Sequence, residues 1–590
     1  MTRRSSRPWL VRFSRRRSER GYVLAVSAMV MVPLLIVAGF AVDLGGNYVQ
    51  ASKIQRAADA AALAGVVWLP DFAKAQTVAL NAASRNGFAA GNPTGTSLTV
   101  TQVNTRQLKV SITTPATQLL AGKLLNISHN ITRSATAEFL SPIPMGSPLA
   151  SLANDPESAA APPQIWLNQS GPGSNKTNGD RFSSGLCTAI NSGWMSGCTS
   201  NTVASQTNAN LDLSNTGYSY IAHVDALHGT PLKFQVFDPA FVYTDDTCGT
   251  NAPTAAQITT LKTKFAAAPY NDAKAAQRYD WTSDNYCPGD QTINGKSDIT
   301  TTYIVRAPDT TSQDLTDNPA ICAISFSPYT GSIYNRLING SGNVITTNSG
   351  GLENMPFYKF FRQWTDICSV ASPVVGDYVI QVTTTASQSS PNFSTTASLT
   401  PGGGGAGSLE TRDMSIATGG HNRYALRTGW GSSMTGTDLG VYGGGRLPIY
   451  VNQNTSSANF YLARIESQYA GMTMGLTFFD IADTAGTASM QVIPPTEYGS
   501  TFPTSQCKFI LDGATTSVVS NTACQITGLT SSSYDGRNVD LKLTLPTDYT
   551  CNDTAANGCW LKVILNFTGT PADTTTWSAV LQGDPVRLVQ

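Results

Sequence analysis

The chain has little charge for its length. Lys, Arg, Asp and Glu make up 13% of its 590 residues, and it has only four histidines. Average soluble domains carry about 25% charged residues. Gly, Thr, Ser and Asn are abundant instead, and this composition favours a β-rich surface protein over a helical cytosolic enzyme. At this length we expect about three or four domains.

Recognisable catalytic and cofactor-binding motifs are also missing. The sequence has no GxSxG motif, and its glycine-rich segment, residues 401–407, lacks the lysine and the apolar helix that follow in a phosphate-binding loop. Two of the scattered histidines, His228 and His421, lie in turn-like contexts. Catalysis needs a base and a nucleophile within reach of each other, or a metal. We therefore expect no enzymatic activity, no catalytic residue and no cofactor.

The strongly basic segment is at the N-terminus. The first 20 residues hold eight arginines and one glutamate, and the remaining chain holds 30 basic and 37 acidic residues. Nucleic-acid binding requires a basic surface, so the acidic excess beyond residue 20 argues against a nucleic-acid partner.

One uncharged run organises the sequence. Residues 22–42 read YVLAVSAMVMVPLLIVAGFAV, and a bilayer core of about 30 Å takes about 20 helical residues. We expect a single transmembrane helix here. The basic segment 1–21 predicts a cytoplasmic N-terminus, with the bulk of the chain extracytoplasmic. Asp43 is expected to be a solvated carboxylate at the membrane boundary.

A removed signal peptide is the alternative interpretation of this run. Cleavage after Ala41, at the small-x-small site Gly39-Phe40-Ala41, would leave a soluble secreted protein. The run is longer than a usual signal-peptide core of about 7–15 residues, which favours the membrane anchor.

All ten cysteines lie beyond the apolar run, on the side expected to be extracytoplasmic. An even number of cysteines in an oxidising compartment predicts disulfides. No CxxC occurs and no histidine stands at ligand spacing from a cysteine, which disfavours a metal site. The sequence leaves the connectivity open, and the simplest scheme pairs neighbours: Cys187–Cys198, Cys248–Cys287, Cys322–Cys368, Cys507–Cys524 and Cys551–Cys559.

Residues 43–140 predict a small α+β head on the apolar helix. The Ala-rich segment 44–69 continues the helix, and its small residues permit close approach to another helix. Segment 71–86 is typical of a second, amphipathic helix. Alternating residues within 97–112 predict a β-hairpin, and 131–139 predicts a returning strand.

Several motifs of this region occur together. Arg20-Gly21 precedes the apolar helix with its Pro33, residues 39–45 read GFAVDLG, and residues 57–65 read AADAAALAG. Over about residues 15–140 the sequence resembles the TadE/TadG-like proteins of the Flp (tight adherence, Tad) pilus-assembly system. The resemblance implies a bacterial, envelope-anchored pilin-like or assembly protein with pilus-assembly or pilin-like partners, and not an enzyme.

Prepilin-type cleavage between Gly21 and Tyr22 is a further possibility. It would remove the basic leader and leave the apolar helix as the new N-terminus. Pilin-type processing motifs usually carry Glu at the fifth position after the cut, where this chain has Val26. This departure disfavours cleavage.

Beyond the head, the composition predicts a linker and two β-rich domains. Residues 141–163 are rich in Pro, Ser and Ala and predict an exposed, semi-extended linker. Residues 164–446 predict an extracytoplasmic β-rich domain, and the seven short candidate strands of 447–590 are typical of a β-sandwich of jelly-roll type. The expected fold class is α+β, mostly β: a long transmembrane helix with a small pilin-like head, then disulfide-stapled β-sandwich domains.

Acidic residues in loops raise a calcium hypothesis. Calcium binds roughly six to eight oxygen ligands. The best candidates are Asp480 and Asp483, just after a predicted strand. No cluster has the EF-hand spacing, and Asx turns and solvated loops account for such residues more often.

The preferred function is structural: a membrane-anchored, pilin-like or assembly protein of a Flp/Tad-type pilus that presents β-domains for interaction or adhesion. The alternative is an anchored or secreted carbohydrate-binding surface protein. Exposed aromatic rings would stack on surface glycans, although Trp in a β-sandwich more often belongs to the core. The candidates are Trp281, Tyr286, Trp364, Trp560 and Trp577.

Overall fold

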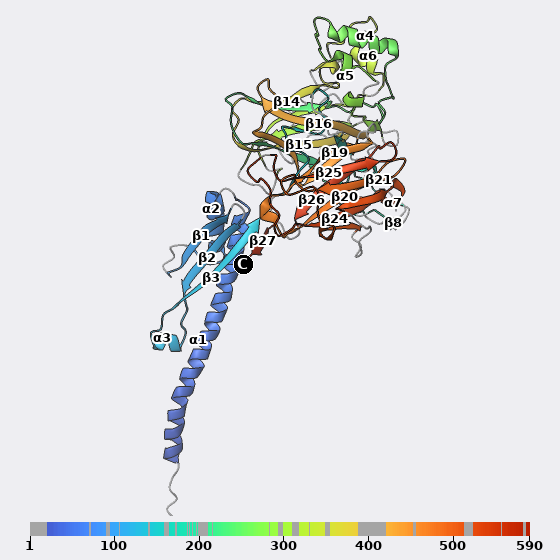
Figure 1. Ribbon diagram of the computed structural model, residues 1–590. Coiled ribbons are helices and arrows are strands. Elements are labelled where there is room, and N and C mark those ends of the chain that lie inside the picture. The colour runs from blue at the N-terminus through green and yellow to red at the C-terminus, as the bar shows by residue number, and fades with distance from the viewer. Residues whose placement is uncertain are drawn as a thin grey trace, which may run out of the picture. The chain divides into compact units, whose positions relative to one another are not determined.

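The chain folds into two compact units (Figure 1). The computed structural model describes residues 20–589, apart from residues 70–71, 90–94, 105–106, 140–141, 159–164, 172–173, 186, 188, 191–192, 196, 199–209, 215, 282–283, 293–298, 310–314, 316–317, 330, 348–354, 387–419, 452–455, 513–522, 556 and 582–585. The N-terminal unit is Met1–Phe139 with Pro585–Gln590, and the β-sandwich unit is Leu140–Asp584.

The N-terminal unit is built on one long helix. α1 (Arg20–Val66) is continuous over 47 residues, through Pro33 and the Gly45-Gly46 pair. The predicted helix 44–69, the second helix, the hairpin and the returning strand are all confirmed. The other elements are α2 (Phe72–Arg85), α3 (Ala121–Leu124) and a 4-stranded antiparallel sheet in the order β1 (Ser97–Asn104), β2 (Gln107–Pro115), β3 (Asn130–Phe139) and β27 (Val586–Val589).

The core of this unit lies between α1, α2 and the sheet. Small residues of α1, including Ala58, Ala61 and Ala62, are fully buried. Gly65 marks the closest approach, because a Cβ atom there would lie 2.6 Å from a Leu108 methyl carbon and 2.8 Å from the carbonyl oxygen of Ala75. The motif AADAAALAG is therefore a packing surface of the unit itself.

The β-sandwich unit consists mainly of two long antiparallel sheets. The 11-stranded sheet has the order β14 (Trp364–Val370), β10 (Leu232–Phe237), β16 (Gly420–Trp430), β6 (Ile165–Ser170), β18 (Arg446–Val451), β26 (Thr574–Leu581), β20 (Thr473–Phe479), β24 (Asn538–Thr544) and β22 (Cys507–Leu511), with β5 (Ser151–Leu152) and β11 (Gln291–Thr292) also paired to β16. The 10-stranded sheet has the order β13 (Ala320–Phe326), β12 (Ile299–Arg306), β15 (Gly376–Ala386), β9 (Tyr218–Val224), β17 (Leu439–Gly444), β4 (Pro144–Met145), β19 (Ser457–Arg464), β25 (Trp560–Phe567), β21 (Ala488–Ile493) and β23 (Gln525–Leu529).

Short helices, strands and turns lie between the strands of the two sheets in sequence. The helices are α4 (Ala255–Ala266), α5 (Ala275–Arg278), α6 (Ile333–Leu337) and α7 (Ser531–Tyr534). Two short strands, β7 (Ala189–Ile190) and β8 (Gly193–Trp194), form a separate pair. The 3-10 turns are Lys176–Asn178, Asp284–Tyr286, Phe357–Lys359, Ser467–Tyr469 and Thr504–Gln506.

Aromatic side chains from the two sheets meet in one core. Tyr220 of β9 and Tyr424 of β16 pack edge to face with ring centroids 6.4 Å apart, and their hydroxyl groups are hydrogen-bonded at 3.1 Å. Phe460 of β19 stacks on Trp577 of β26 at 5.1 Å. Aromatic pairs of this kind add about 0.5–1.5 kcal/mol beyond their buried area.

Disulfides join the two sheets at both ends of the sandwich. Cys322 lies in β13 and Cys368 in β14, the terminal strands at one end. Cys507 opens β22, and Cys524 directly precedes β23, the terminal strands at the other end. The open ends of the sandwich are therefore covalently closed.

Of the segment 141–163, expected to be an exposed linker, the described residues 142–158 belong to the sandwich. Ile143, Met145 and Leu152 are almost fully buried. β4 bridges β17 and β19 in the middle of the 10-stranded sheet, and β5 pairs with β16. The prediction of an exposed linker was wrong because the segment is rich in Pro and Ser overall. Its few apolar residues nevertheless lie in short strands that pair with strands far away in sequence.

The boundary expected between 164–446 and 447–590 does not separate two compact units. β6 pairs with β18, and β18 pairs with β26, so the 11-stranded sheet continues across residue 447. The last strand also departs from the expected C-terminal domain, because β27 pairs with β3 of the N-terminal unit. The β-sandwich unit is thus inserted, in sequence, between two neighbouring strands of the N-terminal sheet.

Candidate functional site: the membrane anchor

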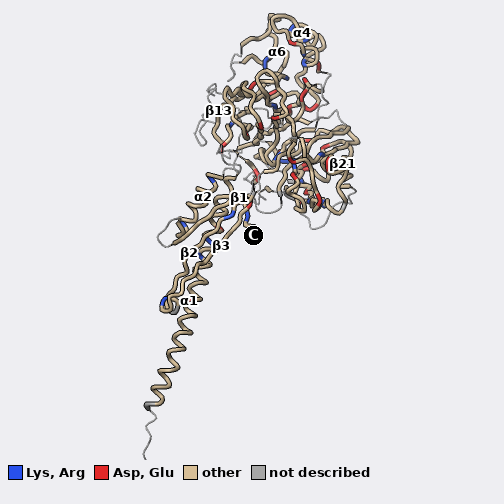
Figure 2. Tube along the Cα trace, turned by 60° about the vertical axis from the view of Figure 1, so that its left-hand side comes forward, with Lys and Arg blue, Asp and Glu red and all other residues tan. Residues whose placement is uncertain are grey.

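The first half of α1 exposes apolar side chains. Tyr22, Leu24 and Met29 are 75%, 74% and 77% exposed, and Figure 2 shows no charged position along this part of the helix. Within the described residues, one helix is long and apolar enough to cross a bilayer, Tyr22–Val66. Apolar surface left in water costs about 25 cal/mol per Å². This half of α1 therefore needs lipid or another protein surface around it.

Arg20 and Gly21 form the first turn of α1, so the bond between Gly21 and the exposed Tyr22 lies within the helix. The sequence disfavours cleavage here, because Val26 stands at the fifth position after the bond, and that stays a prediction.

The second half of α1 packs within its own unit. Its small residues permit close approach to another helix, as expected, and that helix is α2: Ala58, Ala61 and Gly65 face α2 and the sheet of the same chain. This face is buried within the N-terminal unit. The apolar surface of α1 that stays exposed belongs to the first half of the helix.

Asp43 links the two halves, and it is not the solvated carboxylate that the sequence predicted. Its side chain is 4% exposed. Oδ1 accepts the backbone N–H groups of Leu119 and Leu120 at 2.8 and 2.9 Å, and Oδ2 accepts that of Gly122 at 2.6 Å. A carboxylate satisfies the free N–H groups at the start of a helix, here α3. Sequence reasoning missed this role because the partners lie more than 70 residues downstream.

The segment between β2 and β3, residues 116–129, is here called the α3 loop. Gln50 holds its start: its side-chain amide donates to the Pro115 carbonyl and accepts the Thr117 N–H, both at 2.8 Å. Five large apolar side chains on the loop are 43–80% exposed: Leu119, Leu120, Leu124, Leu125 and Ile127. The loop, whose helix α3 lies beside α1 (Figure 1), therefore adds apolar surface next to α1.

The C-terminal strand completes the N-terminal unit. Arg587 of β27 donates from Nε and Nη2 to Oε2 of Glu138 on β3, at 3.1 and 2.8 Å. Oε1 of the same carboxylate accepts a hydrogen bond from Gln107 at 3.2 Å. Glu138 is 6% exposed, so the ion pair fixes the terminal strand beside β3.

The ten cysteines form five disulfides, and the structure contains the same pairs as the neighbour scheme. They are Cys187–Cys198, Cys248–Cys287, Cys322–Cys368, Cys507–Cys524 and Cys551–Cys559. Cys551, Asp553 and Cys559 lie close together. Both thiols of this group are consumed by a disulfide, which leaves one carboxylate as a ligand.

The two calcium candidates lie in a buried acidic cluster. Asp480 is fully buried and Asp483 half-buried. Burial, reinforced by Asp573, raises the pKa of Asp483 to about 8. Burial also raises the pKa of Asp480 well above its ordinary value, and that of Asp573 to about 6. The sequence identified Asp480 and Asp483 but missed Asp573 and Asp535, which no local motif connects to them.

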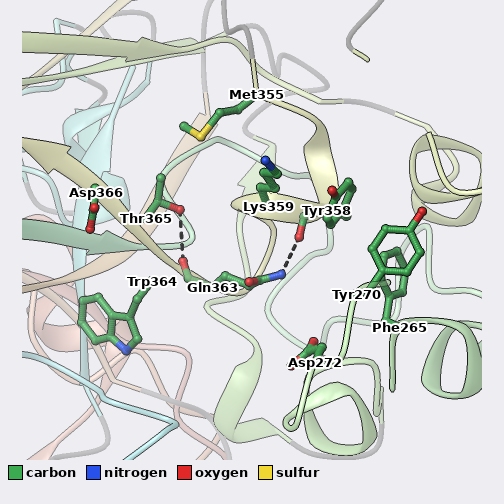
Figure 3. Close-up of a pocket in the computed structure, with 10 residues that line it drawn as sticks. All are labelled: Phe265, Tyr270, Asp272, Met355, Tyr358, Lys359, Gln363, Trp364, Thr365 and Asp366. Carbon is green, nitrogen blue, oxygen red and sulfur yellow. Dashed lines mark hydrogen bonds between the residues drawn. The ribbon is translucent and has the colours of Figure 1, made fainter. Parts of the chain in front are cut away.

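The aromatic residues considered for glycan stacking are mostly in the core. Trp577, Trp560 and Tyr286 are 0–3% exposed, whereas Trp281 and Trp364 are half-buried. Trp364 lines a cavity of about 370 Å³ in the β-sandwich unit. Figure 3 shows Phe265, Tyr270 and Tyr358 gathered on one side of it.

The chain thus combines an apolar helix that is long enough to cross a bilayer with a small α+β unit and, further along the sequence, a disulfide-closed β-sandwich unit. The comparison with protein families makes this more specific. Residues 21–77 match the Tad family, described as "Putative Flp pilus-assembly TadE/G-like". The resemblance inferred from the sequence is thereby confirmed for the N-terminal region. No curated protein and no solved structure matches the chain.

Proposed function

We propose that the protein is an envelope-anchored component of a Flp/Tad-type pilus system, either a pilin-like subunit or an assembly protein. The observation that carries this proposal is the extent of the family match. It covers the exposed apolar half of α1, the buried Asp43 and the small-residue half that packs on α2. Anchor and packing surface thus belong to one pilus-associated module.

In this proposal α1 crosses the membrane once, with its basic end in the cytoplasm. From Tyr22 to Asp43 the helix rises about 32 Å at 1.5 Å per residue, which matches a bilayer core of about 30 Å. The eight arginines before it favour cytoplasmic retention of that end. The β-sandwich unit then lies on the extracytoplasmic side, where disulfides persist. There it serves interaction or adhesion and performs no catalysis.

The α3 loop adds a second membrane contact in this arrangement. Asp43 fixes the loop at the level where α1 leaves the apolar core. Its exposed leucines would then enter the interface, while the ammonium group of Lys123 reaches the lipid headgroups. A unit held by a helix and a loop would be restrained in tilt as well as in depth.

A photo-crosslinking experiment in the native host tests the pilus assignment. Two variants each carry one photoreactive amino acid. In one it replaces Val30, which is 52% exposed on the membrane half of α1, and in the other it replaces Val374, which is 51% exposed on the β-sandwich unit. We expect the Val30 adduct to contain a pilin-like or pilus-assembly protein, and deletion of the gene to abolish pili. Normal pilus numbers after deletion, together with an adduct free of pilus proteins, would overturn the proposal.

A second candidate function, carbohydrate binding, is favoured by the cavity in Figure 3. Half-buried Tyr270 and Tyr358 pack edge to face at 5.3 Å, and the carboxylates of Asp272 and Asp366 also line the space. Aromatic faces beside hydrogen-bonding groups suit sugar rings. Binding to a glycan array that is lost in Tyr270→Ala but kept in Tyr334→Ala would support this function. Absence of binding by the unchanged protein would dismiss it.

A further inference from the structure

Lys176 is a lysine that the fold buries completely. It lies in the 3-10 turn Lys176–Asn178, which follows β6, and its side chain is 0% exposed. Its Nζ atom lies 5.4 Å from the centre of the Phe479 ring. Burial outweighs the ion pair with Asp212 and lowers the pKa of Lys176 below the ordinary value for lysine. A desolvated lysine of this kind is a better nucleophile, because its neutral amine is easier to reach.

The amine points at one side-chain amide. Nζ of Lys176 donates a hydrogen bond to Oδ1 of Asn210 at 2.9 Å. The carbon Cγ is bonded to that oxygen, and with a C=O bond of about 1.23 Å it lies no more than about 4.1 Å from Nζ. A reacting pair needs a separation of about 3–3.5 Å, which a small side-chain movement provides.

The amide group of Asn210 is held in a fixed orientation. Asn210 is 1% exposed. Its Nδ2 donates to the backbone carbonyl oxygens of Arg181 and Ser184 at 2.7 and 2.8 Å, and its Oδ1 also accepts the backbone N–H of Asp212 at 3.0 Å. Donors on the carbonyl oxygen stabilise the negative charge that develops there when a nucleophile attacks the carbon.

Asp212 provides a proton acceptor beside the amine. Its Oδ2 accepts hydrogen bonds from Nζ of Lys176 at 2.7 Å and from Nε of Arg181 at 3.0 Å. Gly197 leaves room for this carboxylate, because a Cβ atom there would lie 2.4 Å from Oδ2. The Asp212 side chain is 24% exposed, so a small product can leave toward solvent. A buried amine, an oriented amide and a carboxylate thus meet at one point.

We propose that Lys176 and Asn210 become joined by an intramolecular isopeptide bond, with Asp212 as the proton carrier. A proton passes from Nζ to Oδ2 of Asp212, and the neutral amine attacks Cγ of Asn210. The Nζ–Cγ bond forms and the Cγ–Nδ2 bond breaks, while a second proton of the attacking nitrogen passes to Nδ2. Ammonia leaves, takes the proton from Asp212 and departs as ammonium. Charge and atoms balance without any oxidant or cofactor.

The bond would add a covalent tie to the β-sandwich unit. It closes a ring that contains the disulfide Cys187–Cys198 in sequence. The turn after Lys176 is attached to β26, because the Gly179 carbonyl accepts the Thr576 hydroxyl group at 2.6 Å. Reductants break disulfides and leave amides intact, so this tie would persist in a reduced chain. The proposal does not depend on the pilus assignment, because it concerns the β-sandwich unit alone.

Peptide mass spectrometry of the reduced, unchanged chain tests the bond. Trypsin does not cleave after a lysine whose amine is part of an amide. We therefore expect one cross-linked species in which peptide 134–181 is joined to peptide 182–233, lighter by one ammonia, about 17 Da, than the two peptides together. Fragment ions should place the link at Lys176 and Asn210.

Two results would overturn the proposal. One is cleavage after Lys176 with peptides 134–176 and 182–233 at their full masses. The other is a loss of ammonia confined to peptide 182–233, which would show an asparagine cyclising on its own backbone. Neither result requires a variant, so the bond is decided even if the variants do not fold.

Variants test the part played by each residue. Lys176→Arg should abolish the cross-linked peptide. Asp212→Asn should reduce it at least about tenfold, because the proton acceptor is lost, and Asp212→Glu should restore part of it. Lys508→Arg, at an exposed lysine of the same unit, should leave it unchanged. Equal cross-linking in Asp212→Asn and in the unchanged chain would overturn the role assigned to Asp212.

Discussion

At the scale of single residues, Asp43 explains why an acid directly follows the apolar run. Its carboxylate accepts three backbone N–H groups at the start of α3. Hydrogen bonds to a charged acceptor are worth roughly 1.5–3 kcal/mol. One side chain therefore ties the α3 loop to the anchor helix.

Replacing Asp43 should release the α3 loop. We expect Asp43→Ala to cost about 2 kcal/mol of local stability, because three N–H groups lose their acceptor. Lys123 in this loop is a trypsin site, so its cleavage rate in the membrane-reconstituted protein should rise at least about tenfold, as expected when opening precedes cleavage. Asp59→Asn is the control, because among the described residues Asp59 accepts a hydrogen bond only from the Gln55 side chain of the same helix. Equal cleavage rates in both variants would contradict this role.

His223 predicts a pH-dependent contribution to stability. Its ring nitrogens lie 2.5 Å from Asp377 Oδ1 and 2.8 Å from Asp225 Oδ1. The hydrogen bond to Asp377 outweighs burial and raises the pKa of His223 from 6.5 to about 9. Since the folded-state pKa is the higher one, the stabilisation is complete below pH 6.5 and is lost as the pH rises through 9.

The His223→Gln variant checks this window by urea unfolding. We expect a loss of about 0.5–1 kcal/mol at about pH 6, a small figure because the side chain is 38% exposed, and almost no loss at about pH 10. A loss that does not change with pH would show that the histidine acts through packing and not through its charge.

At the scale of elements, the sequence predicted those whose signals are local. The uncharged run 22–42, the Ala-rich continuation and the alternating hairpin each carry their own periodicity. The linker 141–163 was misjudged because β4 and β5 are each two residues long and exist through partners elsewhere. For the same reason the sequence identified only Asp480 and Asp483 of the acidic cluster. Asp573 lies beside them because of the register of the strands.

The α3 loop should lie in the membrane interface. A cysteine replacing Leu124, 80% exposed, is labelled with an environment-sensitive dye. The native cysteines do not interfere, because all ten are in disulfides. In lipid vesicles we expect blue-shifted emission that spin-labelled lipids quench. The matched control is Val103→Cys, at the opposite end of the β1–β2 hairpin.

The anchor helix provides the second control for this experiment. A label at position 35, within the apolar run, reports on insertion of α1 by itself. Quenching at position 35 without quenching at 124 would reject the loop contact and leave the anchor intact. Absence of quenching at both positions would reject the anchor.

At the scale of the whole molecule, the sequence predicted the β-rich fold class but missed that the sheets continue across the expected domain boundary. The β-rich class follows from residue content, and the neighbour scheme, the simplest of the pairings that the sequence leaves open, agrees with the structure. The fusion of 164–446 with 447–590 depends on β6 pairing with β18 and on β4 bridging β17 and β19. Such long-range pairs leave no local trace in one sequence.

A disulfide at an end of the sandwich should contribute more to the stability of the fold than Cys551–Cys559, which closes a short loop. Cys322–Cys368 spans 46 residues and Cys551–Cys559 spans 8. Chain-entropy arguments give about 4 and 2.5 kcal/mol for such loops. We expect the double variant Cys322→Ala/Cys368→Ala to lose about 1.5 kcal/mol more stability in urea than Cys551→Ala/Cys559→Ala. The reverse order would show that closing the sheet ends contributes little.

The central claim is that α1 anchors the chain in the envelope. Its most direct test is the mature N-terminus of the native protein in carbonate-washed membranes, set against the soluble fraction. We predict a membrane-retained chain that is intact or begins at Tyr22. A soluble chain that begins at or after Val42 would contradict the anchor and favour a secreted binding protein.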